Sequence, residues 1–390
     1  MKKNISYFLI TCVLCSIAFS QNEKNNPEIK FIKGNISDKI SSVKDADKEY
    51  SSKLSVKAVD FVLENMDILK DDRDLAGLAI TAVFAFPESE FNADKQLTVN
   101  KFGSIFYGFA DKNVRISVLD KMISLSKNSA EPEIIAFVNT YLRGASEEKN
   151  DATDVEKKAI QAIAEIGNNE SFTILYNCYQ TKVWPQFEKD IKTAIISLSD
   201  KSTEEIMTII KDADFAQMKQ ISELFIENSQ ISATLKSEIA ENLLTNCMIK
   251  VRDSSKISKE MSLFQLSCAK ILYENKWTRS SALMTSYFEV AKSEFNAGFL
   301  TEKEFSDAIL YVEYTASKDS VKIFTKYLGE LNKEIENGNL PAVNVVSALI
   351  KALGALGDKS AFDCLLYTTY LNYPEEIVAQ ARSALSSLKW

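Results

Sequence analysis

Histidine is absent from the whole 390-residue chain. This absence excludes Ser-His-Asp and Cys-His catalytic arrangements, HExxH zinc sites and the side chain that usually moves protons near neutral pH. Enzymes can use carboxylates, lysine or tyrosine instead. The sequence therefore disfavours catalysis and leaves carboxylate chemistry as the alternative.

Glycine and proline are also scarce, with 11 and 6 residues, whereas apolar residues make up 46% of the chain. Few helix breakers and many apolar residues are typical of a mostly helical protein with short turns and a large core. We therefore expect an all-α fold.

Long apolar runs are missing except near the N-terminus, where residues 1–20 have the features of a signal peptide. Lys2 and Lys3 precede an apolar run over residues 5–17, and Ala18-Phe19-Ser20 forms a small-x-small cleavage site. The run is shorter than the roughly 20 residues of a membrane-spanning helix. We expect export to the periplasm or cell envelope. Cys12 and Cys15 leave a lipoprotein as the minor alternative, because neither follows a small residue.

Basic residues are outnumbered by acidic ones. Without Lys2 and Lys3 the chain has 44 basic and 54 acidic residues, a formal charge of −10. Nucleic-acid phosphates and anionic membrane surfaces require a basic surface. We therefore expect protein partners, with no nucleic acid and no integral membrane span.

Cysteine occurs four times after the leader, at Cys178, Cys247, Cys268 and Cys364, and never as CxxC. This spacing contains no metal or redox motif, so we expect no metal and no cofactor. The four side chains are best interpreted as small buried apolar groups. Export permits disulfides, and Cys247 and Cys268 are the pair that neighbouring helices could bring together.

A short phrase recurs in the sequence. Residues 352–362 (ALGALGDKSAF) closely match residues 162–172 (AIAEIGNNESF), and both place two apolar residues three apart before a glycine and a polar turn. We call the set of such apolar pairs the apolar ladder. It consists of Val83 and Phe86, Met122 and Leu125, Ile163 and Ile166, Ile195 and Leu198, Val312 and Thr315, Leu353 and Leu356, and Leu385 and Leu388. Repeats at such spacing predict stacked helical hairpins, because one hairpin cannot bury its apolar face alone.

This pattern resembles the HEAT-repeat family, clearly over residues 75–180 and 300–390. With its leader, the chain is similar to exported bacterial HEAT-repeat proteins such as those of spirochaetes. The resemblance implies a right-handed, HEAT/armadillo-like α-solenoid of about seven to nine hairpins over residues 37–390. The polar composition of residues 21–36 predicts a disordered tether before it. The phrase is lost over 210–300, which we expect to be irregular, and residues 250–262 resemble a charged loop.

Three clusters are candidate sites. Asp71, Asp72 and Asp74 lack the central glycine and distal glutamate of a calcium loop, so we expect them to cap the helix at 75–86. The aromatic stretch 102–109 lacks a phosphate-loop ending and is predicted to pack as a helix or connector between repeats, with an exposed patch for a partner as the alternative. Tyrosines 367, 370 and 373 could pack between hairpins or contact a partner. Three glutamate pairs, at 147–148, 204–205 and 375–376, are expected at helix starts.

No residue is identified as catalytic, and the partner-binding residues are unknown. The leading hypothesis is an exported, non-catalytic scaffold or adaptor that binds proteins through a solenoid surface. The alternatives are a structural envelope protein that self-associates and, less favoured, a carboxylate-based hydrolase. The hydrolase would require a cleft with two carboxylates, one of them desolvated.

Overall fold

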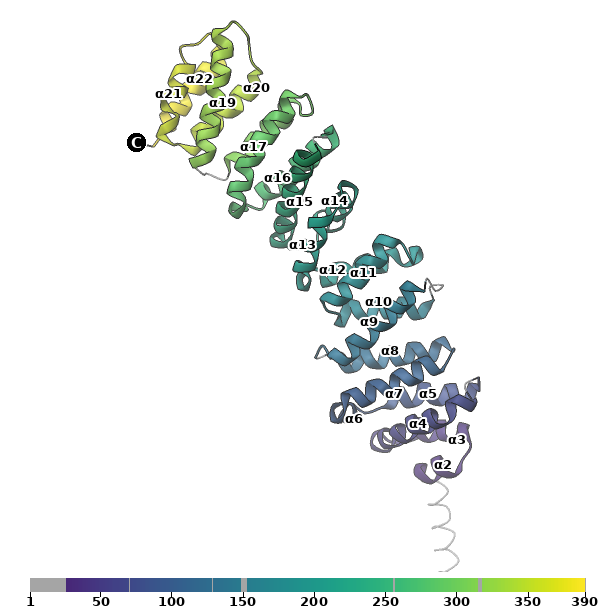
Figure 1. Cartoon of the computed structure of the whole chain (residues 1–390). Coiled ribbons are helices and arrows are strands. Elements are labelled where there is room, and N and C mark those ends of the chain that lie inside the picture. The colour runs from purple at the N-terminus through teal and green to yellow at the C-terminus, as the bar shows by residue number, and fades with distance from the viewer. Residues whose placement is uncertain are drawn as a thin grey trace, which may run out of the picture. The chain divides into compact units, whose positions relative to one another are not determined.

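The computed structural model describes residues 26–69, 71–127, 129–148, 153–254, 257–314 and 318–389. Within these ranges the regular elements are helices, α2 to α22, with one isolated β-bridge between Asp358 and Lys389 (Figure 1). The predicted all-α class is confirmed. The predicted leader with Cys12 and Cys15, residues 21–25 of the predicted tether, Thr315 and Trp390 lie outside the described residues.

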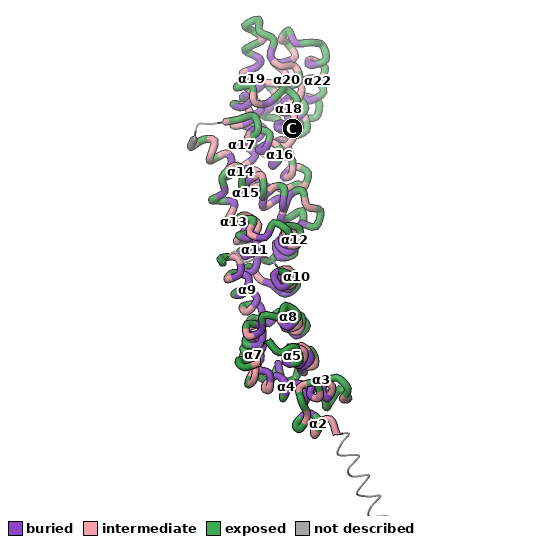
Figure 2. Tube along the Cα trace, turned by 90° about the vertical axis from the view of Figure 1, so that its right-hand side faces the viewer, coloured by how far each residue is buried: buried purple, intermediate pink, exposed green. Residues whose placement is uncertain are grey.

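The chain divides into two compact units, and the boundary between them in the sequence falls between Ser202 and Thr203. In unit 1, helices α3, α5, α8, α10 and α12 form one layer, and helices α4, α7, α9 and α11 form the other (Figure 2). The helices of unit 1 are α2 (Pro27–Lys33), α3 (Ile36–Asp45), α4 (Lys48–Leu69), α5 (Arg73–Ala85), α6 (Glu88–Ala93), α7 (Lys95–Gly108), α8 (Lys112–Ser126), α9 (Pro132–Glu147), α10 (Asp154–Ile166), α11 (Asn169–Thr181) and α12 (Glu188–Leu198).

Unit 2 repeats this alternation. Helices α16, α18, α20 and α22 pack side by side in one layer, and α13, α15, α17, α19 and α21 form the other. The helices are α13 (Thr203–Asp212), α14 (Phe215–Ile221), α15 (Ala233–Ser254), α16 (Lys259–Glu274), α17 (Ser281–Asn296), α18 (Glu302–Glu313), α19 (Lys318–Glu336), α20 (Val343–Leu356), α21 (Phe362–Thr368) and α22 (Glu375–Ser387). Among the described helices, none is long and apolar enough to cross a membrane.

The apolar ladder falls on equivalent helices. Its described pairs lie at the C-terminal ends of α5, α8, α10 and α12 in unit 1 and of α20 and α22 in unit 2, and Val312 lies at the C-terminal end of α18. These helices belong to one layer of each unit. We call these the ladder helices. Most ladder side chains are buried, and Leu356 and Leu385 are half-buried. Each pair therefore fills the space between one ladder helix and its neighbours.

A second contact recurs at the same helix ends. Ser197 Oγ on α12 donates to the carbonyl oxygen of Ala164 on α10 at 2.9 Å, and Ser387 Oγ on α22 donates to that of Gly354 on α20 at 3.0 Å. Both residues of the second pair lie 190 positions after those of the first, which is also the offset of the repeat phrase. The repetition thus extends from sequence to hydrogen bonding, and each such bond contributes about 0.5–1.5 kcal/mol.

Each copy of the repeat phrase requires glycine at the end of its helix, Gly167 in the first copy and Gly357 in the second, but for different reasons. Gly357 has φ +66°, in the left-handed region that favours glycine. Gly167 is extended, but a Cβ there would lie 2.4 Å from the carbonyl oxygen of Ile163. Both positions end a ladder helix, so glycine serves as its C-terminal stop.

Part of the predicted tether is helical, so that prediction is wrong over its described residues. The Asn26 side chain caps α2, Pro27 occupies its first turn, and Phe31 is buried. Lys39 Nζ donates to the Phe31 carbonyl oxygen at 2.5 Å. The Lys39 ammonium group also lies 4.9 Å from the centroid of the Phe31 ring, and this cation–π contact stabilises the packing of α2 against α3.

The middle of the chain is more regular than predicted. The described residues of 210–300 are mainly helical, and a π-helical stretch, Ser222–Ile226, continues α14. The loop predicted at 250–262 is shorter, because α15 continues to Ser254 and Ser258 caps α16. Glutamates 204, 205, 375 and 376 lie in first turns as predicted. Glu147 and Glu148 instead lie at the end of α9, because Gly144 does not stop that helix.

The ladder positions should dominate stability. Replacing the fully buried Leu353 with alanine should lower the free energy of unfolding by about 2–5 kcal/mol, because it removes apolar contact and leaves a cavity. Leu310→Ala, at an exposed leucine on α18, is the matched control and should cost less than about 1 kcal/mol. Urea denaturation followed by circular dichroism measures both. Equal losses would contradict the role given to the ladder.

Candidate functional site

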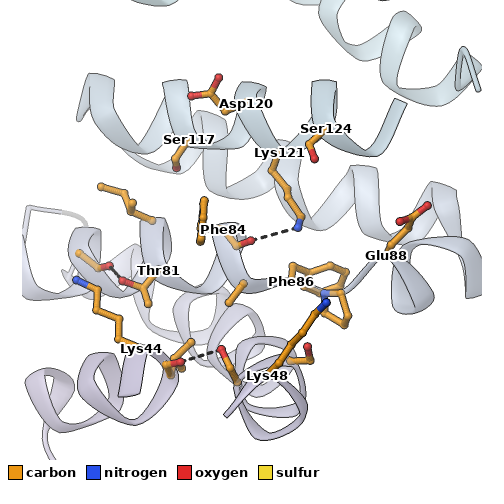
Figure 3. Close-up of a pocket in the computed structure, with 17 residues that line it drawn as sticks. Lys44, Lys48, Thr81, Phe84, Phe86, Glu88, Ser117, Asp120, Lys121 and Ser124 are labelled. Carbon is orange, nitrogen blue, oxygen red and sulfur yellow. Dashed lines mark hydrogen bonds between the residues drawn. The ribbon is translucent and has the colours of Figure 1, made fainter. Parts of the chain in front are cut away.

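A groove of about 1080 Å³ opens in unit 1 between α3, α5 and α8, and extends to the start of α4 and the Phe86–Glu88 connection (Figure 3). It lies on the layer that contains the ladder helices. Its floor comes from α5, and its walls come from α3 and α4 on one side and α8 on the other. Helices α3, α5 and α8 each bury one face against neighbouring helices, and part of their opposite face lines this groove.

The floor is apolar. Helix α5 buries Leu75, Leu78, Ala82 and Val83, and the period of 3.6 residues places Gly77, Ile80, Thr81 and Phe84 on the opposite face. Phe84 is 82% exposed. A Cβ at Gly77 would make an ordinary van der Waals contact with Ile40, at 3.4 Å from its Cδ1. The α5 floor therefore presents a large exposed aromatic ring in a hollow.

The α8 wall is polar. It contributes Ser117, Asp120, Lys121 and Ser124. Lys121 Nζ donates to the carbonyl oxygen of Phe84 at 3.2 Å, and Figure 3 shows this side chain reaching from α8 towards α5. Burial lowers the pKa of Lys121, and Glu88 opposes this shift. The Lys121 amino group therefore lies at the backbone of the residue that carries the exposed ring.

The opposite wall carries two exposed lysines, Lys44 at the end of α3 and Lys48 at the start of α4. Ser51 Oγ donates to the Val43 carbonyl oxygen at 2.8 Å and joins these two helices. Two acidic residues also line the groove. Asp120 pairs with Lys158 at 2.5 Å, and Glu88 lies at the Phe86–Glu88 end.

The acidic cluster is a helix cap, as predicted. The Asp72 side chain accepts from the backbone N–H groups of Asp74 and Leu75 at 2.8 and 2.9 Å. Over the described ranges, no group of three or more Cys, Asp or Glu side chains is arranged to hold a metal ion.

The aromatic clusters are separate from the groove. Phe102 and Phe106 are buried in α7, which confirms the predicted helix packing. Tyr373 is buried, whereas Tyr370 is 76% exposed, so the C-terminal tyrosines divide between packing and surface. The Tyr367 hydroxyl donates to Glu336.

The four cysteines are free thiols, and all except the half-buried Cys364 are buried. The prediction of small buried groups is therefore confirmed for Cys178, Cys247 and Cys268. Burial raises the pKa of Cys247 to about 12 and those of Cys178 and Cys364 to about 11. Such thiols are poor nucleophiles.

A second polar cluster lies inside unit 2. Glu294 on α17 is 1% exposed, and it accepts from Gln265 Nε2 on α16 at 3.1 Å. Glu294 Oε2, Gln265 Oε1 and the Tyr287 hydroxyl are buried without a hydrogen-bond partner. Burial raises the pKa of Glu294 to about 7, against hydrogen bonds from Ser262 and Gln265. This carboxyl group is closed to solvent, unlike the groove.

Glu294 should make stability depend on pH. Because its pKa is higher in the folded than in the unfolded chain, its stabilising contribution is complete below about pH 4.5 and is lost as the pH rises to about 7. Glu294→Gln should therefore match the parent chain at pH 4 and exceed its unfolding free energy by about 3 kcal/mol at pH 8. Urea titrations across this range measure the difference. Exposed Glu289→Gln, on the same helix, is the control. A pH-independent difference for Glu294→Gln would contradict the assignment.

The comparisons with known proteins identify no relative. No protein-family model matches the sequence, and a search of curated proteins finds no match. The HEAT-repeat resemblance therefore depends on the repeat phrase and the apolar ladder alone.

Proposed function

We propose that the protein is an exported, non-catalytic scaffold or adaptor that binds protein partners through a right-handed, HEAT/armadillo-like α-solenoid of about seven to nine hairpins. The proposal is supported by the apolar ladder, by the alternation of helices between two layers in each unit, and by the leader-like residues 1–20. Stacked hairpins offer extended surfaces that bind other chains through many modest contacts.

The observation that carries the proposal is Phe84. An exposed aromatic ring in a groove with an apolar floor is unlike an isolated apolar residue on a flat surface. Burying a phenylalanine side chain on binding contributes about 1.5–3 kcal/mol. Aromatic residues in pockets are also the usual anchors of protein interfaces.

The carboxylates of the described groove favour binding over hydrolysis. Asp120 and Glu88 are exposed, and Asp120 is paired with Lys158. A glycosidase-like pair requires one desolvated carboxyl group in the cleft. The strongly desolvated Glu294 is buried in unit 2, away from solvent.

Site-specific photocrosslinking tests the proposal. Benzoylphenylalanine is placed at position 84 of the mature chain, residues 21–390, and the protein is irradiated in its native envelope fraction. The control position is Ile68, which is 84% exposed on α4 and does not line the groove. One or two stoichiometric adducts at position 84 alone would support an adaptor. Adducts only with copies of the same chain would favour self-association, which sedimentation at several concentrations then measures.

Phe84→Ala should weaken binding of the crosslinked partner by at least about tenfold, because it removes the aromatic anchor. The free energy of unfolding should change by less than about 0.5 kcal/mol, since the ring is exposed. Titration calorimetry and urea denaturation measure the two quantities. Ile68→Ala should leave both unchanged, and an equal loss of affinity in the two variants would contradict the assignment of the groove.

A further inference from the structure

We propose that the groove of unit 1 takes an acidic segment of a partner protein, in which carboxylates flank a large apolar side chain. This inference rests on the proposed function and specifies the chemistry of the partner. Apolar contact comes from the α5 floor, and charge complementarity comes from lysines on both walls.

Three lysines, Lys44, Lys48 and Lys121, line the groove. Among the described residues, no carboxylate lies within 4 Å of the ammonium group of any of these three lysines. The whole chain is acidic, with 54 acidic and 46 basic residues. The groove therefore carries a group of positive charges on a protein whose net charge is negative.

The acidic residues of the groove offset this charge only in part. Asp120 already pairs with Lys158, which does not line the groove. Glu88 lies at one end, next to Pro87, and acts on Lys121 through charge alone. An excess of positive charge remains on the walls, and such an excess steers and orients an acidic partner.

The geometry places charge on both sides of the exposed ring. Figure 3 shows Lys121 extending from α8 towards Phe84 and Lys48 extending from the opposite wall towards Phe86. Lys121 now donates to a neutral acceptor, the Phe84 carbonyl oxygen. A partner carboxylate would offer the stronger, charge-assisted hydrogen bond. An apolar residue over Phe84 would thus have carboxylates on either side.

The open form of the groove favours a polypeptide segment over a small molecule. Small-molecule pockets span about 300–1,000 Å³ and enclose most of their ligand. The groove measures about 1080 Å³, and its central ring is 82% exposed. An amphipathic segment can lay its apolar face along such an open floor.

The test begins with a display selection of random 12-residue peptides on the immobilised mature chain. The enriched peptides should carry two or more Asp or Glu residues around an aromatic or large aliphatic residue. Fluorescence anisotropy then gives the affinity of one labelled peptide for each variant. Lys44→Glu/Lys48→Glu should weaken binding at least about tenfold, and raising NaCl from about 50 to 500 mM should weaken it several-fold.

Matched controls separate charge from folding and from steric access. Lys33→Glu/Lys189→Glu reverses two exposed lysines of unit 1 outside the groove and should change the affinity less than about twofold. Ser124→Trp fills the groove without changing its charge and should also weaken binding about tenfold. Ser104→Trp, at an exposed serine on α7, should leave binding unchanged. Circular dichroism verifies that each variant is folded.

The outcomes distinguish the two proposals. The proposal of an acidic segment would be overturned if the enriched peptides were neutral or basic, or if their affinity depended on Phe84 but not on Lys44 and Lys48. Either result would leave the proposed function in place. Enriched peptides unaffected by Phe84→Ala or Ser124→Trp would overturn the groove as a binding site. Displacement of the peptide by oleate, with tighter binding of oleate itself, would identify a lipid ligand and overturn the protein partner.

Discussion

The structure depends on burial of apolar side chains near the C-terminal end of each ladder helix. Ile163 with Ile166 and Leu353 with Leu356 are the clearest examples, and the first residue of each pair is fully buried. One helix cannot shield such a pair from water, so each ladder helix packs against a neighbour in its layer. The serine-to-carbonyl hydrogen bonds at Ala164 and Gly354 then fix neighbouring helices at the same level. Stacking thus follows from a local requirement that recurs along the chain.

The same constraint produces the surface available for binding. A helix that buries one stripe of residues against its neighbours leaves the opposite stripe outside. In α5 this outer stripe contains Gly77, Ile80 and Phe84, and α3 and α8 supply walls on either side. The groove is therefore a consequence of stacking, and its chemistry comes from residues that stacking leaves free.

The repeat phrase, the helix caps and the ladder could be predicted from the sequence, because each depends on residues close together in the chain. The groove could not be predicted in the same way. Phe84 follows the ladder residue Val83, so helical geometry turns its side chain by about 100° towards the outer face of α5. The exposure of Phe84 could therefore be predicted once Val83 was assigned to the buried face. Lys44 and Lys121 are far apart in sequence, and only the packing of α3, α5 and α8 brings them to one groove. Burial of Glu294 likewise depends on contacts between helices. The α2 helix was missed because its polar composition concealed the single buried ring of Phe31.

Hydrogen–deuterium exchange of residues 21–390, with and without the partner captured at position 84, tests the central claim most directly. It reports which backbone amides become protected when the partner binds. We expect added protection in α5 and α8, which form the floor and one wall of the groove, and unchanged exchange in α20 and α22. Protection confined to unit 2, or spread evenly over both units, would contradict the claim that the groove beside Phe84 is the binding surface.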